Sequence, residues 1–212
     1  MGRQGNFPHG IDILTEADYF TLAIRTNAYL NVSCFVAQFP EYFTAMMEHL
    51  VFVKLQHWEK GMRLLAAQAL SLLVVFNPKH FIEILMDRLL ELCFNKVVHV
   101  RHGAITGLAE LLIGLSGNSE RNRRKHLEKA LRKLSKKEQT IIADSANKVE
   151  FQDRYEMLLK ENYMALITPT QMEIISSAIQ KVEKERLYRG RGGEIVREAV
   201  CFLIKALCIS RV

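Results

Sequence analysis

One nine-residue pattern recurs along the chain and constrains its fold more than any other feature. In each copy an apolar residue and an arginine are followed, three and six positions after the arginine, by small or apolar residues, except that Asn31 stands at the second of these positions in the first copy. The four copies lie at residues 24–32, 62–70, 100–108 and 196–204. The first three arginines, Arg25, Arg63 and Arg101, are 38 residues apart. Self-similarity near 40 residues with helical spacing is typical of stacked helical hairpins. We therefore expect an all-α protein with the architecture of an α-solenoid.

The apolar positions of each copy fall on one face of a helix. In the third copy these positions are Val100, Ala104, Gly107, Leu108 and Leu111. Small residues in the middle of such a face let neighbouring helices approach closely. A single hairpin cannot bury a face of this kind alone, so we expect the hairpins to stack.

Proline residues mark the first helix of each hairpin. Pro40, Pro78 and Pro169 each precede a helical run, and proline fits the first helical turn because its missing N–H has no partner to lose there. We expect first helices from Pro40, over 81–94 after the start signal at Pro78, and from Pro169. We expect second helices over 58–76 and 98–115, and another after the turn at 188–193.

The regular spacing breaks after the third copy. Arg101 and Arg197 are 96 residues apart, which is one period of 38 plus 58 extra residues. We therefore expect helical repeats over 1–116, a basic and partly helical insertion over 117–168, and a final hairpin over 169–212. The first repeat lacks a first helix and neither end supplies a polar cap, so the sequence predicts a segment of a longer array.

The basic character of the chain belongs to the expected insertion. The whole chain has a net charge of +6, and residues 120–137 alone hold nine basic and two acidic residues. This stretch contains the strongest candidates for partner binding, which are Arg121, Arg123, Arg124 and Lys125. Such a stretch is read as a solvated helix, as a site for an acidic protein surface or as a nucleic-acid site. Without an aromatic platform or recognition helix, nucleic acid is the less favoured reading.

A second candidate site is the glycine-rich turn before the fourth copy. Gly190 and Gly192 lack the third glycine of a dinucleotide-binding fingerprint, because Ile195 occupies that position. The turn is read either as a plain connection between helices or as an exposed loop. In an exposed loop, Arg189 and Arg191 would reach an acidic partner.

The sequence shows no pattern that points to catalysis. Serine, histidine and aspartate residues occur without a nucleophile elbow, and His99, His102 and Cys93 lack the further ligand that a zinc site needs. We expect no catalytic residue, no cofactor and no metal site. The four cysteines fit small buried hydrophobes and a reducing, cytosolic setting. No apolar run reaches the length of a membrane span, and Trp58 stands at a spacing typical of core residues.

The repeat itself resembles the HEAT family. The match rests on a proline-led helix followed by a helix that contains Val-Arg-x-x-Ala-x-x-Ala-Leu, and it is best at 62–70 and 100–108. HEAT repeats often place an acidic residue or asparagine about six positions before the arginine, and only Asn95 fits here. We therefore expect no Asp–Arg ladder and no role for the arginines beyond the turn and surface of each repeat.

Further stretches resemble the tubulin-folding cofactor D family. They are residues 2–14 and 17–20, Phe39-Pro40-Glu41-Tyr42, His57-Trp58, Arg101-His102-Gly103, and Leu187-Tyr188-Arg189-Gly190 with Gly192-Gly193. They occur in the family's order and indicate a middle-to-C-terminal segment, whereas residues 117–184 match poorly.

This resemblance implies a non-enzymatic chaperone of the cytoplasm that associates with microtubules. Its implied partners are β-tubulin, tubulin-folding cofactors C and E, and an ADP-ribosylation-factor-like small GTPase. Its implied roles are assembly and disassembly of the α/β-tubulin heterodimer and, within a complex, stimulation of GTP hydrolysis. The alternative function is that of a generic HEAT adaptor whose basic segment binds nucleic acid or an acidic membrane surface.

Overall fold

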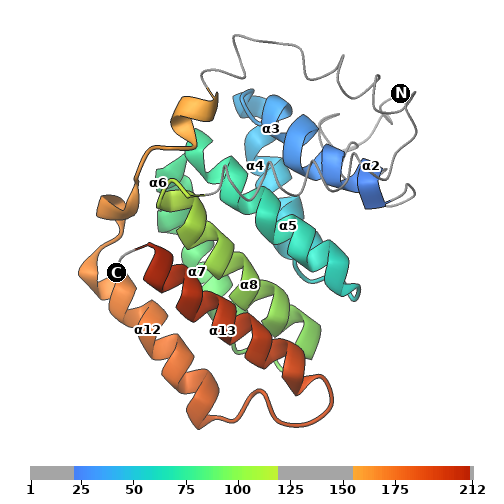
Figure 1. Ribbon diagram of the computed structural model, residues 1–212, viewed down its shortest axis with the longest axis vertical. Coiled ribbons are helices and arrows are strands. Elements are labelled where there is room, and N and C mark those ends of the chain that lie inside the picture. Colours follow the sequence, from blue (N-terminus) through green and yellow to red (C-terminus); the bar gives the residue numbers. More distant parts are fainter. Residues whose placement is uncertain (1–21, 119–154, 211–212) are drawn as a thin grey trace.

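The computed structural model describes residues 22–118 and 155–210, and these residues form helices and no strand. Figure 1 shows α5, α8 and α13 side by side in one layer, with α7 behind them and α12 at the edge. The expected fold class, an α-solenoid of HEAT-like hairpins, is confirmed for this part of the chain. The expected helical basic insertion lies mostly outside the described residues.

One layer contains the second helix of each hairpin. Its members, in order along the stack, are the run α2 (Leu22–Asn27), η2 (Ala28–Val32) and α3 (Ser33–Val36), then α5 (Lys60–Leu73) with η4 (Val74–Phe76), then α8 (Val98–Leu115) and α13 (Gly193–Ile209). Helix α8 packs against α5 on one side and against α13 on the other. It therefore lies at the centre of the layer.

The other layer contains the first helix of each hairpin. Its members are α4 (Pro40–His49) with η3 (Leu50–Lys54), then α6 (Pro78–His80), η5 (Phe81–Leu85) and α7 (Met86–Leu92), then α12 (Pro169–Lys184). Neighbours in this layer touch through side chains. The ring of Phe43 lies 6.0 Å from that of Phe81, and the Gln171 amide donates to the carbonyl of Ile82 at 3.2 Å.

The helix starts follow the predicted signals. Pro40, Pro78 and Pro169 each occupy the first turn of a helix. The Asn77 side chain accepts from the backbone N–H of His80 at 3.2 Å, and Thr168 forms a capping box with Gln171. Each cap satisfies backbone groups that a helix end leaves without a partner.

Glycines allow α8 to approach the preceding hairpin closely. A Cβ atom on Gly103 would lie 1.7 Å from the Leu55 carbonyl oxygen, and one on Gly114 would lie 2.4 Å from the Ser71 carbonyl oxygen. Real Cβ atoms do not come so close, so only glycine fits without moving the backbone. The prediction that small residues of the repeat permit close helix packing is confirmed here.

The stack continues beyond the long sequence interval between the third and fourth copies. Helix α13 packs on α8 as α8 packs on α5, although residues 119–154 intervene in the sequence. After them come η6 (Met164–Leu166) and then α12. The division of the chain into 1–116, 117–168 and 169–212 remains a proposal.

Two expectations about buried residues are wrong. Cys201 and Cys208 are exposed on α13, whereas Cys34 and Cys93 are buried as expected. Trp58 was expected in the core, and it is 76% exposed. The reason is that the second helix begins at Lys60 rather than at residue 58, which leaves Trp58 in the turn before it.

Candidate partner-binding site

The turns that join the two helices of each hairpin lie side by side along one edge of the stack. We call this the turn edge, and we define it as residues 55–59, 93–97 and 185–192. In Figure 1 it is the lower end of the molecule, where α5, α8 and α13 begin. Two buried arginines hold these turns in place.

Arg63 is 2% exposed and fixes the first turn. Its Nη1 donates to the carbonyls of His57 at 2.8 Å and of Trp58 at 2.7 Å. Its Nε donates to Nδ1 of His102, on α8, at 3.0 Å. One side chain therefore ties a turn to its own helix and to the next hairpin.

Arg101 repeats this arrangement one hairpin further on. Its Nη1 donates to the carbonyls of Asn95 at 2.6 Å and Lys96 at 3.0 Å, and its Nη2 donates to the carbonyl of Leu187 at 2.9 Å. The expectation that these arginines have no role beyond the turn and surface of each repeat is therefore wrong. They form rungs between hairpins, in which Nδ1 of His102 and the Leu187 carbonyl take the place of the aspartates of a HEAT ladder.

The charge states at the turn edge follow from burial. Burial lowers the pKa of Arg63 and of Arg101 from the ordinary value. Burial lowers the pKa of His102 to about 4, and the Arg63 charge acts in the same direction. Near neutral pH, His102 is therefore uncharged, and its Nδ1 is free to accept the Arg63 hydrogen bond.

The structure presents Trp58 to solvent on a backbone that cannot easily move. Its carbonyl accepts from Arg63, and its ring lies 5.4 Å from the His57 ring. On the adjacent turn, Val97 is 45% exposed. Exposed tryptophan on a rigid support suits protein recognition, because little side-chain freedom is lost on binding. Sequence reasoning missed Trp58, which the sequence places as the first residue of the helix expected over 58–76, whereas the helix begins at Lys60.

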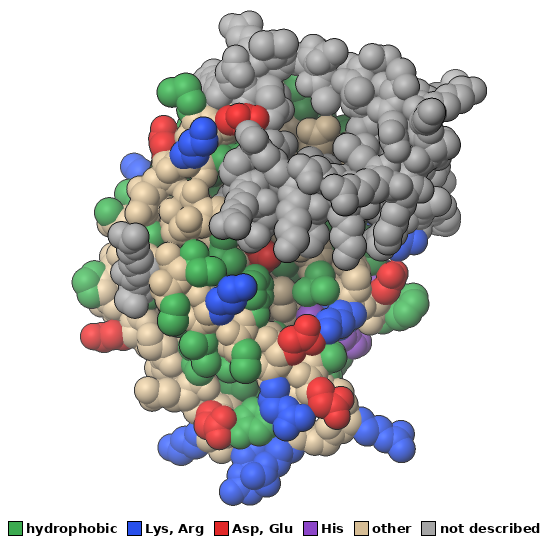
Figure 2. Space-filling model, viewed as in Figure 1, with side chains coloured by type: hydrophobic (Ala, Val, Ile, Leu, Met, Phe, Trp, Pro, Cys, Tyr) green, Lys and Arg blue, Asp and Glu red, His purple; other side chains and the backbone are tan. Residues whose placement is uncertain are grey.

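Arg189 and Arg191 also lie on the turn edge, and both are exposed. The loop between α12 and α13 bends through positive φ angles at Arg186, Gly190 and Gly192. Figure 2 shows Lys and Arg side chains gathered at this end of the molecule, with acidic side chains between them. The two arginines thus lie on the same edge as Trp58, two turns further along the stack.

The other predicted binding residues cannot be placed. Arg121, Arg123, Arg124 and Lys125 lie outside the described residues. Their role as a binding surface remains a prediction from sequence.

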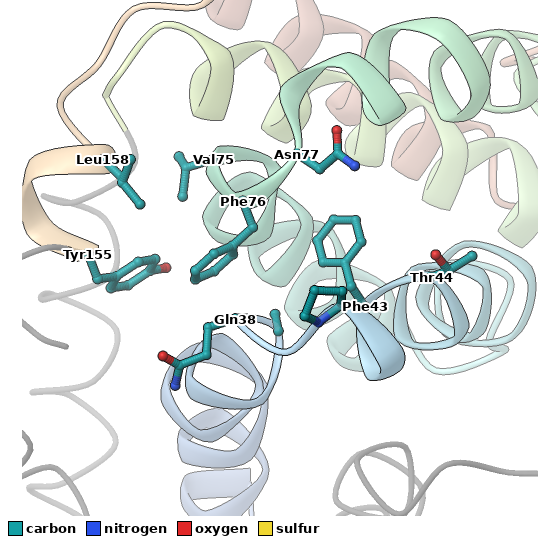
Figure 3. A pocket seen from close by; sticks show the side chains of 10 residues that line it. Gln38, Phe43, Thr44, Val75, Phe76, Asn77, Tyr155 and Leu158 are labelled. Carbon is teal, nitrogen blue, oxygen red and sulfur yellow. The ribbon is translucent and has the colours of Figure 1, made fainter.

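A pocket of about 460 Å³ opens at the opposite end of the hairpins, where one hairpin leads into the next. Figure 3 shows the rings of Tyr155 and Phe76 facing one another at its wall, with centroids 5.4 Å apart. The Tyr155 hydroxyl donates to the Leu72 carbonyl at 3.0 Å, so residues just after 119–154 are anchored on the first repeats. The residues that line this pocket include no Asp, Glu, Lys, Arg or His, so the wall offers no acid or base near neutral pH.

Helix α8 also contains a buried acid, Glu110, which is 6% exposed. Burial raises the pKa of Glu110 to about 7, while Ser71 and Lys205 act in the opposite direction. These two residues belong to α5 and α13, so Glu110 responds to both neighbours of α8. Its place inside the stack makes it a determinant of stability rather than a binding residue.

The described residues also lack two other kinds of feature. Residues 22–118 and 155–210 contain no cluster of three or more His, Cys, Asp or Glu side chains arranged to hold a metal ion. No helix within the same ranges is long and apolar enough to span a membrane.

Comparison with known proteins supports the resemblance drawn from the sequence. The chain is 26% identical over 211 residues to tubulin-specific chaperone D of Dictyostelium discoideum, covering 99% of this chain and 11% of that protein. It is 29% identical over 79 residues to tubulin-folding cofactor D of Schizosaccharomyces pombe, covering 37% of this chain and 7% of that protein. No protein-family model matches the chain, and no solved structure matches it significantly. The predicted resemblance is thus confirmed, and nearly the whole chain is similar to a segment of a much longer protein named tubulin-specific chaperone D.

Proposed function

We propose that this chain is a scaffold segment of a tubulin-folding cofactor and that its turn edge binds β-tubulin. The observation behind this proposal is the exposed Trp58 on a turn that buried Arg63 fixes. The names of the two relatives supply the partner class. The mechanism is surface recognition, and no bond in the partner is made or broken by this chain.

The chemistry of the turn edge suits an acidic protein surface. Tryptophan and arginine are the residues most enriched where protein interfaces gain their binding energy. Here Trp58 supplies apolar area, while Arg189 and Arg191 supply positive charge on a loop that Arg101 holds against the previous turn. An acidic region of β-tubulin would meet the arginines and an apolar residue beside it would cover Trp58.

The remaining partners follow from the same proposal. Tubulin-folding cofactors C and E and an ADP-ribosylation-factor-like small GTPase would assemble with the longer protein to make or take apart the α/β-tubulin heterodimer. In such an assembly, stimulation of GTP hydrolysis would depend on the positioning of partners. The proposed setting is cytoplasmic and microtubule-associated.

A binding experiment with three variants tests the proposal. In the protein at its full natural length, Trp58→Ala should weaken β-tubulin binding at least 10-fold, because an interface tryptophan contributes about 2 kcal/mol or more. The double variant Arg189→Glu, Arg191→Glu should slow association and make binding less sensitive to salt. The charge-matched control is Lys79→Glu, Lys160→Glu, two exposed lysines outside the turn edge. The proposal fails if Trp58→Ala and the control variant bind alike.

The same assay separates the alternative function, which rests on the excess positive charge of residues 120–137. A generic adaptor would bind DNA or anionic vesicles in a salt-dependent manner, and charge reversal at Arg123, Arg124 and Lys125 would abolish that binding. If the wild-type protein shows no such binding at low salt, the alternative is removed.

A further inference from the structure

The pocket at the end opposite the turn edge has aromatic walls that are already in place. Its volume of about 460 Å³ lies within the range of about 300–1,000 Å³ that is typical of ligand pockets. The rings of Phe76 and Tyr155 stack with 6° between their planes. The Tyr155 hydroxyl donates to the Leu72 carbonyl and lies 3.1 Å from Cys34 Sγ, which fixes the ring. A ligand would therefore meet a preformed wall, and little ordering would be lost on binding.

The wall of this pocket selects for an uncharged ligand. None of the described residues that line it is charged near neutral pH. A charged group that entered would lose its water without gaining an ion pair, which costs free energy. An aromatic ring would instead gain edge or stacking contacts with Phe43 and with the Phe76–Tyr155 pair. The cavity therefore fits an apolar ring better than an acid or a base.

One rim residue presents a hydrogen-bond donor in a fixed orientation. The Asn77 side-chain oxygen accepts from the backbone N–H of His80 at 3.2 Å and caps α6. Because the oxygen is committed to this cap, the side-chain nitrogen of Asn77 remains a donor, and it has no partner among the described residues. In Figure 3, Asn77 lies on the same side of the pocket as Phe43 and Thr44, across from Tyr155. A carbonyl of a ligand in the cavity would accept from this nitrogen.

Exposed apolar side chains extend the surface beyond the cavity itself. Phe39 is 39% exposed and Met157 is 70% exposed. Their neighbours in the chain, Pro40 and Leu158, line the pocket. Large exposed apolar side chains beside a pocket indicate an interaction surface, and methionine adapts its shape to a bound partner. The site therefore suits a peptide chain, with one side chain in the cavity and its neighbours on Phe39 and Met157.

We propose that this pocket binds an uncharged peptide segment of a second partner protein. An aromatic side chain of that segment lies between Phe43 and the Phe76–Tyr155 pair, and a backbone carbonyl beside it accepts from Asn77. The pocket and the turn edge lie at opposite ends of the hairpins, so both can be occupied at once. The inference does not depend on what the turn edge binds.

Photo-crosslinking of the protein at its full natural length tests the site. The probe is N-acetyl-phenylalanine amide with a diazirine on its ring, which is uncharged and has one aromatic ring beside carbonyl groups. Peptide-resolved mass spectrometry should find the label concentrated on residues 37–44, 75–77 and 155–158. Excess unlabelled N-acetyl-phenylalanine amide should compete with the probe, and the charged N-acetyl-aspartic acid amide should not. Label spread equally over this site and the exposed residues Ile84 and Ile174, which do not line the pocket, would overturn the proposal.

A variant of the rim donor tests the predicted contact. Asn77→Asp keeps the cap, because aspartate caps helices as well as asparagine does, but it replaces the donor by a negative charge. It should lower the labelling about 5-fold or more, the effect of one lost hydrogen bond, with an unchanged urea unfolding midpoint. The matched control is Asn162→Asp, since the Asn162 side-chain oxygen also accepts from a backbone N–H, that of Met164 at 2.9 Å. Equal labelling of the two variants would overturn the role of Asn77.

A longer competitor separates a peptide site from a site for small molecules. Alanyl-phenylalanyl-alanine, blocked at both ends, should compete at a several-fold lower concentration than N-acetyl-phenylalanine amide, because its flanking residues reach Phe39 and Met157. Equal potency of the two competitors would overturn the peptide as the occupant.

Discussion

Helices α8 and α13 contain the same arginine motif but occupy different environments. Every residue from Val100 to Leu115 of α8 is buried, whereas the buried residues of α13 are Gly193, Val196, Ala199, Leu203 and Ala206. Helix α8 has a neighbour on both sides in its layer, and α13 has one among the described residues. The motif therefore predicts a helix with an arginine at a fixed position. Whether that arginine bonds to an adjacent hairpin depends on whether one packs beside the helix.

The sequences of the two helices reflect this difference. Gly103, Gly107 and Gly114 make α8 thin enough to be enclosed, and its apolar residues surround the helix. A helix that is apolar on all sides is one that is buried on all sides. Helix α13 instead places charged residues such as Glu194 and Lys205 among its apolar ones.

The largest expected effect comes from filling the close approach on α8. Gly103→Ala should lower the free energy of unfolding by about 3 kcal/mol or more, because the new Cβ would lie 1.7 Å from the Leu55 carbonyl oxygen. Gly61→Ala is the control, since its Cβ meets only a side-chain atom at 3.4 Å and should change stability by about 0.5 kcal/mol or less. Urea unfolding midpoints of the two variants measure both. Similar midpoints would mean that α8 does not approach the turn as closely as described.

The next largest effect is the difference in stability loss between Arg101 and Arg197, which occupy the same position of the motif. Arg101→Ala should cost about 3 kcal/mol, because it removes three hydrogen bonds and leaves buried carbonyls without partners. In the isolated 212-residue chain, Arg197→Ala should change stability by about 0.5 kcal/mol or less, because Arg197 is exposed. Thermal and urea unfolding of both variants would check this. Equal losses would show that burial does not distinguish the two helices.

A pH titration tests the buried histidine that accepts a hydrogen bond from Arg63. The pKa of His102 is about 4 in the folded chain, against about 6.5 when unfolded. Below pH 6.5 the unfolded chain takes up the proton first, so the contribution of His102 to stability should fall by up to about 3 kcal/mol as the pH drops from 6.5 to 4. His102→Gln should remove that slope. Glu110 titrates with the opposite sign in this range, so the measurement is the difference in stability between wild type and His102→Gln. A difference that stays the same between pH 6.5 and 4 would contradict the assigned acceptor role.

The smallest effect concerns the buried acid on α8. The pKa of Glu110 is about 7, so the folded chain holds a proton that the unfolded chain releases above pH 4.5. Stability should therefore fall as the pH rises from 4.5 to 7, and Glu110→Gln should raise stability at pH 8 by about 2 kcal/mol. Glu198→Gln, on the exposed side of α13, is the control and should show no such gain.

The sequence predicts the repeat and its helix starts well because both depend on local signals. The 38-residue spacing and the prolines at positions 40, 78 and 169 determine the hairpins, and the helix over 98–115 has the predicted bounds. The same pattern places Arg63 and Arg101 one period apart. It does not show that they contact the next hairpin, because the two acceptors differ: Arg63 donates to the His102 side chain and Arg101 to the Leu187 backbone carbonyl. A backbone acceptor leaves no residue-type signal in the sequence.

The candidate site was predicted less completely, and for a related reason. Arg189 and Arg191 are recognisable from the sequence by their charge. The sequence allows either a plain connection or an exposed loop there, and in the structure both arginines are exposed. Trp58 was assigned to the core because periodicity cannot tell the last residue of a turn from the first residue of a helix. The helix begins two residues later than expected, at Lys60, and Trp58 is therefore exposed in the turn and not buried in the core.

The central claim is that the turn edge, rather than the pocket at the opposite end of the hairpins, meets β-tubulin. Hydrogen–deuterium exchange of the full-length protein with and without β-tubulin tests it most directly. We expect slower exchange at residues 55–59, 93–97 and 185–192 when β-tubulin is bound, with residues 37–44 and 75–77 around the pocket unchanged. Protection confined to the pocket residues, with the turn edge exchanging as in the free protein, would contradict the account.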